Sequence, residues 1–209
     1  MTTMNTSNYR IRIEPQDENM GPVYFRRLMP GLVNAVDTEV WFPITARDVS
    51  KYPQIPFNPN WQYVDVGCGL AEFIPSLVGR VRKKPIAIEF ASFNVMRFLL
   101  DHTDARGQEE RVQELQRRIQ VYTDPSMVRL LNKPLGRAIR DTTLHGSADV
   151  VIDSIGPTTY PESEFQKIGF GKHDQALYRR LSERVREYEL LLLKRGGQLI
   201  TRNEVITKE

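Results

Sequence analysis

The chain has 209 residues, of which 40% are hydrophobic and 26% are charged. This balance excludes a chain too polar to fold, and the length suits one globular domain. The formal net charge of +3 comes from short basic groups interleaved with acidic residues, which is typical of a solvated surface and not of a dedicated nucleic-acid binder.

The N-terminal part of the chain has only short patterns. Alternating apolar and polar residues predict strands over 9–13 and 39–45. Residues 23–36 have a helical pattern, which Pro30 interrupts. The segment 47–60 contains three prolines and is expected to be an extended connector.

Residues 1–60 are therefore expected to form an extension or cap, and residues 61–209 a domain of their own. In this second part strands and helices alternate, which predicts βαβ units and a mostly parallel sheet with helices on both faces. The expected strands are 63–66, 85–89, 119–123, 149–153 and 198–201, and the expected helices are 71–80, 93–100, 108–118, 126–140 and 174–194.

A glycine-rich turn stands between the strand at 63–66 and the helix that follows. Gly67 and Gly69 lack side chains, so the backbone can turn sharply there and approach a ligand closely. The following helix offers amide hydrogens and a positive dipole end, and Asp65 can accept hydrogen bonds from an amine or a water. A dinucleotide-binding turn has glycine or alanine where this chain has Glu72, and a carboxylate facing the phosphate counts against NAD.

A second carboxylate, Glu89, ends the second strand of this part, 22 residues after Gly67. An acidic residue at this place can accept hydrogen bonds from both hydroxyls of a ribose. NAD enzymes share the feature, so Glu89 indicates a nucleoside and leaves its identity open.

The pattern Asp-x-Gly-x-Gly-x-Ala over 65–71 resembles motif I of the class I S-adenosylmethionine-dependent methyltransferases, in which glycine often stands at the place of Ala71. The segment 193–199 is similar to that family's approach to its fifth strand, a helix end followed by two glycines. The resemblance covers residues 61–201, about two thirds of the chain.

The resemblance implies a Rossmann-like three-layer α/β sandwich that binds S-adenosyl-L-methionine. Asp153, after the fourth strand, is the candidate catalytic residue, and Tyr160 and His173 in the loop beyond it are candidates for the acceptor side. The residue after Glu89 would pack near the adenine, and an aspartate after the third strand would contact the adenine amino group. The implied cofactor-binding residues are Asp65, Gly67, Cys68, Gly69, Glu89, Phe90 and Asp124.

Cys68 is the single cysteine, which excludes an intramolecular disulfide, and we expect its thiol to be packed inside and not to act as a nucleophile. The three histidines are scattered without metal-ligand spacing, so no metal site is predicted. The polar N-terminus has no signal-peptide pattern, and no apolar run approaches the length of a membrane span. These features predict a cytoplasmic protein that is not associated with a membrane.

The end of the chain departs from the family pattern. The family's sheet has seven strands, and this chain has room for a sixth strand over 203–207 but not for a seventh. Either the chain is a fragment, or the strands at 9–13 and 39–45 complete the sheet edge. Because an unpaired edge invites pairing, an oligomer or a partner chain at that edge is a further expectation.

The function implied is an S-adenosylmethionine-dependent methyltransferase, an enzyme that transfers a methyl group by in-line displacement. The sequence Asp-Ser-Ile-Gly over 153–156 differs from the Asn-Pro-Pro-Tyr pattern of enzymes that methylate nucleic-acid bases, so a small-molecule acceptor is favoured. RNA and protein acceptors are alternatives. A non-catalytic methyltransferase-like binding or scaffold protein is a second hypothesis, and an NAD-dependent oxidoreductase is a third.

Overall fold

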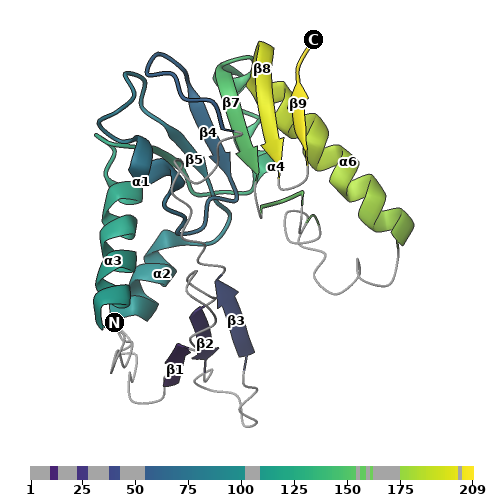
Figure 1. The fold of residues 1–209 in the computed structure, drawn as a ribbon. Coiled ribbons are helices and arrows are strands. Elements are labelled where there is room, and N and C mark those ends of the chain that lie inside the picture. The colour runs from purple at the N-terminus through teal and green to yellow at the C-terminus, as the bar shows by residue number, and fades with distance from the viewer. Residues whose placement is uncertain are drawn as a thin grey trace.

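The computed structural model contains two separate sheets, shown in Figure 1. One is a three-stranded antiparallel sheet, and the other has six strands in the order β6-β5-β4-β7-β8-β9. The residues that the structure describes are 10–13, 23–27, 38–42, 55–101, 109–153, 156–158, 161, 175–201 and 204–209.

The small sheet consists of β1 (Arg10–Ile13), β2 (Val23–Arg27) and β3 (Thr38–Phe42), with β2 in the centre. The predicted strands at 9–13 and 39–45 are confirmed with slightly different bounds. The helix predicted over 23–36 is wrong over β2, where Val23, Tyr24 and Phe25 are β-branched or aromatic residues that pair with strands on both sides. These N-terminal strands pair with one another in a sheet of their own, so the alternative in which they complete the edge of the larger sheet does not hold.

The large sheet establishes an α/β fold with a mostly parallel sheet. Five of its strands are parallel, and the last is antiparallel to its neighbour. The last strand lies within 203–207 and confirms the expected sixth strand. The strands are β4 (Tyr63–Val66), β5 (Ile86–Ile88), β6 (Arg129–Leu131), β7 (Ala148–Asp153), β8 (Leu193–Thr201) and β9 (Val205–Thr207).

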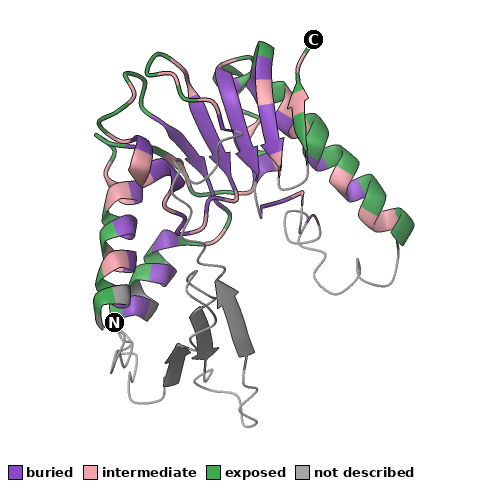
Figure 2. Ribbon diagram, in the orientation of Figure 1, coloured by how far each residue is buried: buried purple, intermediate pink, exposed green. Residues whose placement is uncertain are grey.

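Helices cover both faces of the large sheet, as predicted, because its strands are apolar on both faces. Tyr63 packs with α1, α2 and α3, whereas its neighbour Val64 packs with α4 and α6. Figure 2 shows the central strands as almost entirely buried. The helices are α1 (Phe73–Leu77), α2 (Phe93–Asp101), α3 (Glu109–Thr123), α4 (Leu135–Ala138) and α6 (Gln175–Leu192), and a short 3₁₀ turn, η3, spans Thr142–Leu144.

The third parallel strand lies later in the chain than predicted. Residues 119–123 are the last part of α3, and the strand is β6, inside the segment 126–140 that was predicted to be helical. The alternation of Ile119, Val121 and Thr123 suggests a strand, but Ile119 and Tyr122 are buried and continue the helical stripe that begins at Val112. Packing of this stripe against the sheet extends the helix.

The helix after the glycine turn is shorter than predicted. It spans five residues instead of the ten expected over 71–80. Among the described residues, none of the helices has both the length and the apolar character needed to cross a bilayer.

Candidate functional site

The candidate site lies at the carboxyl ends of the parallel strands. The chain continues from β4 to β5 on one side, whereas β7 lies on the other side of β4. In open α/β sheets the loops part at such a reversal of strand order, and ligands bind there. The glycine turn follows β4 at this point, Glu89 follows β5, and Asp153 ends β7.

The glycine turn requires glycine at two positions. Gly67 has φ +66° and Gly69 has φ +50°, a left-handed region that other residues rarely adopt. The amide of Gly67 donates to the carbonyl of Ile88 over 2.8 Å, and the amide of Gly69 donates to Oε2 of Glu89 over 2.8 Å. The amides of these two glycines are therefore engaged within the protein, because the end of β5 already accepts their hydrogens.

Glu89 joins two segments that are far apart in sequence. Its side chain is buried, and its Oε1 accepts a hydrogen bond from the amide of Ala91 over 2.9 Å while Oε2 accepts from Gly69. Phe90, the next residue, is 49% exposed. The predicted ribose-binding carboxylate thus meets the predicted cofactor turn, with an aromatic ring on the surface beside them.

Asn132 is a residue at this edge that sequence reasoning missed. It follows β6, and its Nδ2 donates to the carbonyls of Glu89 and Ala91 over 2.8 and 2.6 Å. Its Oδ1 accepts from the amide of Phe93 over 3.1 Å, so Asn132 fixes the start of α2. A polar residue directly after a strand is a sequence signal for a site at this edge. The signal was missed because residues 126–140 were predicted to be helical.

Asp124 does not belong to this edge. It follows α3 and precedes β6, so it lies near the amino ends of the strands, where Lys84 donates to the carbonyl of Pro125. Its carboxylate caps a turn by accepting from the amide and hydroxyl of Ser126 over 2.8 and 2.6 Å. These bonds lower the pKa of Asp124. The contact with the adenine was predicted because the third strand was placed at 119–123. Asp124 instead precedes the strand, so it lies at the opposite end of the sheet.

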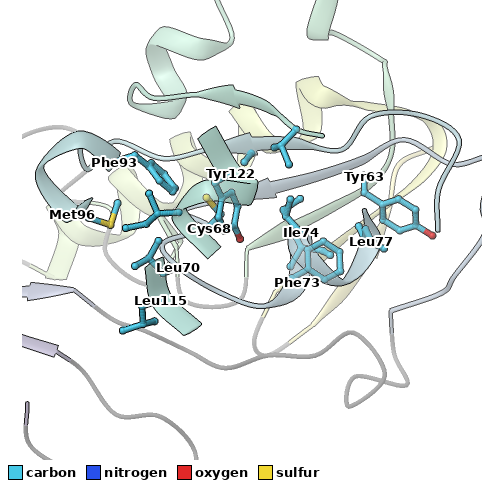
Figure 3. Packing of buried hydrophobic residues seen from close by; sticks show 14 of the residues in the cluster. Tyr63, Cys68, Leu70, Phe73, Ile74, Leu77, Phe93, Met96, Leu115 and Tyr122 are labelled. Atoms are coloured by element: carbon cyan, nitrogen blue, oxygen red, sulfur yellow. The ribbon is translucent and has the colours of Figure 1, made fainter. Parts of the chain in front are cut away.

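Two buried carboxylates and the Cys68 thiol surround the glycine turn. Asp65 and Glu89 are 4% and 5% exposed, and Cys68 packs in the core shown in Figure 3. Burial raises the pKa of the Cys68 thiol well above its usual value, and the nearby negative charges of Asp65 and Glu89 raise it further. Burial therefore favours the protonated thiol. The prediction that Cys68 is packed inside is confirmed.

Glu72 does not face a ligand phosphate. Its Oε2 contacts Nε of Arg118 at 2.9 Å and Nη2 of Arg117 at 3.1 Å, and both arginines come from α3. The carboxylate points toward α3 and is matched by positive charge, so the prediction that Glu72 repels a dinucleotide at the turn loses its basis.

The loop after β7 covers the glycine turn from the other side. A Cβ atom added to Gly67 would lie 2.5 Å from Cα of Gly156 and 2.8 Å from Cδ of Pro157. Asp153, which is fully buried, accepts from the amide of Gly156 over 2.6 Å, and its other oxygen accepts from the amide and hydroxyl of Thr158, each over 2.7 Å. The predicted role of Asp153 as a base requires an accessible carboxylate, and this arrangement favours a structural role instead.

Tyr160 and His173, the candidates for the acceptor side, lie outside the described residues. Among the described residues, a hollow of about 380 Å³ lies between Thr158 and α6. A second hollow of about 560 Å³ lies at the amino ends of β5 and β6, away from the glycine turn. Within the described ranges, no three His, Cys, Asp or Glu side chains gather as metal ligands.

Comparison with protein families gives no family whose model matches the chain. Comparison with curated proteins gives no match either.

Proposed function

We propose that this chain binds S-adenosyl-L-methionine at the glycine turn and transfers its methyl group to a small-molecule acceptor. The observation that carries the proposal is the 2.8 Å hydrogen bond between the Gly69 amide and Glu89. It brings the two cofactor-binding motifs of the resembled family, which lie 20 residues apart, to one place. The strand order β6-β5-β4-β7-β8 reverses direction at β4, and this supports the proposal because doubly wound sheets bind nucleotides at such a reversal.

The charge at the site favours this cofactor over a dinucleotide. Asp65 and Glu89 place two carboxylates at the turn, and the amides of Gly67 and Gly69 are engaged within the protein. α1 has only five residues, so its dipole is weak. A pyrophosphate needs amide donors and positive charge, whereas a sulfonium, an ammonium and ribose hydroxyls need acceptors and negative charge. The site offers acceptors.

The residues present fit the nucleoside half of the cofactor. Glu89 would accept from the ribose hydroxyls and the exposed Phe90 would lie against the adenine, while Asp65 would face the amino-acid end. When bound, the cofactor supplies a methyl group on a positively charged sulfur, which is already a good leaving centre. The protein's part is then to position the acceptor and to exclude water, which the covering loop of Gly156 and Pro157 supports.

Isothermal titration with S-adenosylhomocysteine tests the proposal. We expect micromolar binding, about −8 kcal/mol, which Glu89→Ala abolishes and Asp124→Ala leaves unchanged. Asp124→Ala is the matched control, because this aspartate was assigned to the cofactor from the sequence and lies elsewhere in the structure. Absence of binding by the folded wild-type protein would refute the proposal, and fluorescence of bound NADH in its place would favour the oxidoreductase.

Binding without turnover would favour a scaffold protein. Methyl transfer from labelled S-adenosylmethionine, screened over small molecules, RNA and protein, separates the enzyme from the scaffold and identifies the class of acceptor.

A further inference from the structure

α3 carries a buried arginine that bonds to the backbone of the glycine-turn segment. Arg118 is 3% exposed, and arginine is almost never this buried unless it is paired. Its Nη1 donates to the carbonyl of Leu70 over 2.8 Å. Its Nε lies 2.9 Å from Oε2 of Glu72 and 2.8 Å from Oε1 of Glu114. One guanidinium therefore holds both a carbonyl and a side chain of the segment that follows Gly69.

Tyr122 adds a second bond from the same face of α3. It lies one helical turn after Arg118, is fully buried, and donates its hydroxyl hydrogen to the carbonyl of Ala71 over 2.9 Å. Burial raises the pKa of Tyr122, so the phenol stays protonated and remains a donor. Arg118 and Tyr122 thus bond to two successive carbonyls, those of Leu70 and Ala71, and Figure 3 shows Tyr122 beside Cys68.

The hydrogen bonds from Arg118 and Tyr122 satisfy carbonyl groups that are buried. Leu70 and Ala71 are 2% and 7% exposed, so water cannot replace a lost donor to their carbonyls without a change in structure. On the other side of the segment, Glu89 accepts from the amide of Gly69. The segment from Gly69 to Glu72 is therefore held between the end of β5 and α3, and its conformation depends on both.

We propose that Arg118 and Tyr122 are positioning residues for the ligand site: without touching the ligand, they hold the segment 69–72 in the conformation that places the Gly69 amide against Glu89. The identity of the ligand rests on the proposed function, but the control of the segment by α3 does not. Apolar side chains could fill the same space, but they would leave the two carbonyls without these donors, and at position 118 they would also leave Glu72 and Glu114 without this guanidinium.

Two substitutions remove the donors and keep the volume. Tyr122→Phe deletes one hydroxyl, and Arg118→Met keeps an unbranched apolar side chain. Leu115→Ala is the matched control, because Leu115 is a fully buried residue of α3 in the same core and makes no hydrogen bond to residues 69–72 through its side chain. Leu115→Ala should lower the thermal midpoint by an amount comparable with the test variants.

The first readout is the dissociation constant for S-adenosylhomocysteine at a temperature where every variant is folded. We expect Tyr122→Phe to weaken binding about tenfold and Arg118→Met by more, since each loses a buried hydrogen bond. The dissociation constant of Leu115→Ala should stay within about twofold of the wild-type value. This substitution removes apolar packing but no hydrogen bond to residues 69–72. Arg118→Lys, which can still donate to one acceptor, should restore part of the affinity. Equal losses in the control and the test variants would overturn the proposal.

The second readout needs no ligand. Amide hydrogen exchange over 69–72 should be faster in Tyr122→Phe and Arg118→Met than in the wild type, and unchanged in Leu115→Ala. If the wild type binds no S-adenosylhomocysteine, the proposed function fails, and exchange still decides whether α3 positions the segment. Unchanged exchange in both test variants would overturn the proposal whether or not the ligand binds.

Discussion

Replacing Gly67 with alanine tests how tightly the loop after β7 packs against the glycine turn. Two costs act at this position. Gly67 has φ +66°, where a residue with a Cβ loses about 1–2 kcal/mol. The added Cβ would also lie 2.5 Å from Cα of Gly156 and 2.8 Å from Pro157, which are backbone and ring atoms that cannot rotate away. Overpacking of this kind costs about 1–3 kcal/mol.

Two other glycines separate these costs. Gly79 has φ +77° and nothing within 4 Å of an added Cβ, so Gly79→Ala carries the backbone cost alone, about 1–2 kcal/mol. Gly156 does not have a left-handed φ, and its added Cβ would contact the carbonyl oxygen of Val66, so Gly156→Ala carries the contact cost alone, about 1–3 kcal/mol. Gly67→Ala should lose about 2–5 kcal/mol, close to the sum of the two.

The assay is urea unfolding at 25 °C followed by circular dichroism, with free energies of unfolding compared among the three variants and the wild type. If Gly67→Ala lowers the free energy of unfolding no more than Gly79→Ala does, the reasoning is refuted. That result would mean that Gly156 and Pro157 do not lie against the turn in solution.

Further predictions concern single side chains. Glu89→Ala should lower the free energy of unfolding by about 1–3 kcal/mol in urea, because two buried amides lose their acceptor. Asp153→Asn should lower it by a similar amount, about 1–3 kcal/mol, since an amide cannot accept at both ends from Gly156 and Thr158. Hydrogen bonds from Arg117 lower the pKa of Glu114 to about 2 from its unfolded 4.5, so its contribution to stability is complete above pH 4.5 and is lost as the pH falls toward 2. Glu114→Gln should remove this part of the pH dependence, measured by urea midpoints at neutral and acid pH. Cys68 should react with a thiol reagent only when the protein unfolds.

Each of these predictions has its own contradicting outcome. An unchanged midpoint for Glu89→Ala or Asp153→Asn would show that the hydrogen bonds of that carboxylate do not stabilise the fold. Equal loss of stability in acid for Glu114→Gln and the wild type would assign the effect to other groups. Rapid labelling of folded protein would mean that Cys68 is accessible.

The parts of the fold that the sequence predicted well are those with strong local signals. Val64 and Val151 lie in short strand patterns bounded by turns, and both are in buried parallel strands. α6 follows a long apolar stripe and lies within its predicted segment. Glycine spacing marked the turn at Gly67, and Glu89 meets it because parallel strands end at one edge of the sheet.

The errors came from signals that local patterns cannot separate. Ile119, Val121 and Thr123 alternate like a strand, and only the burial of Tyr122 against the core identifies them as helix. Contacts between residues far apart in the chain leave no local pattern in the sequence. Arg118 is one of many charged residues in α3, and nothing in its neighbours indicates that it reaches the carbonyl of Leu70, 48 positions earlier in the chain.

The strand order has a consequence for how the chain folds. β4, β5 and β6 form one group of sequential neighbours that pair in parallel. β7, β8 and β9 form a second group of sequential neighbours, in which β7 and β8 are parallel and β8 and β9 are antiparallel. The groups meet at the pairing of β4 with β7, where the amide of Gln62 bonds to Asp149, 87 positions away. Closing so long a loop costs entropy before any contact repays it, which slows the folding of parallel sheets. We therefore expect the two groups to form first and the joining of β4 to β7 to set the rate at which the site at their boundary appears.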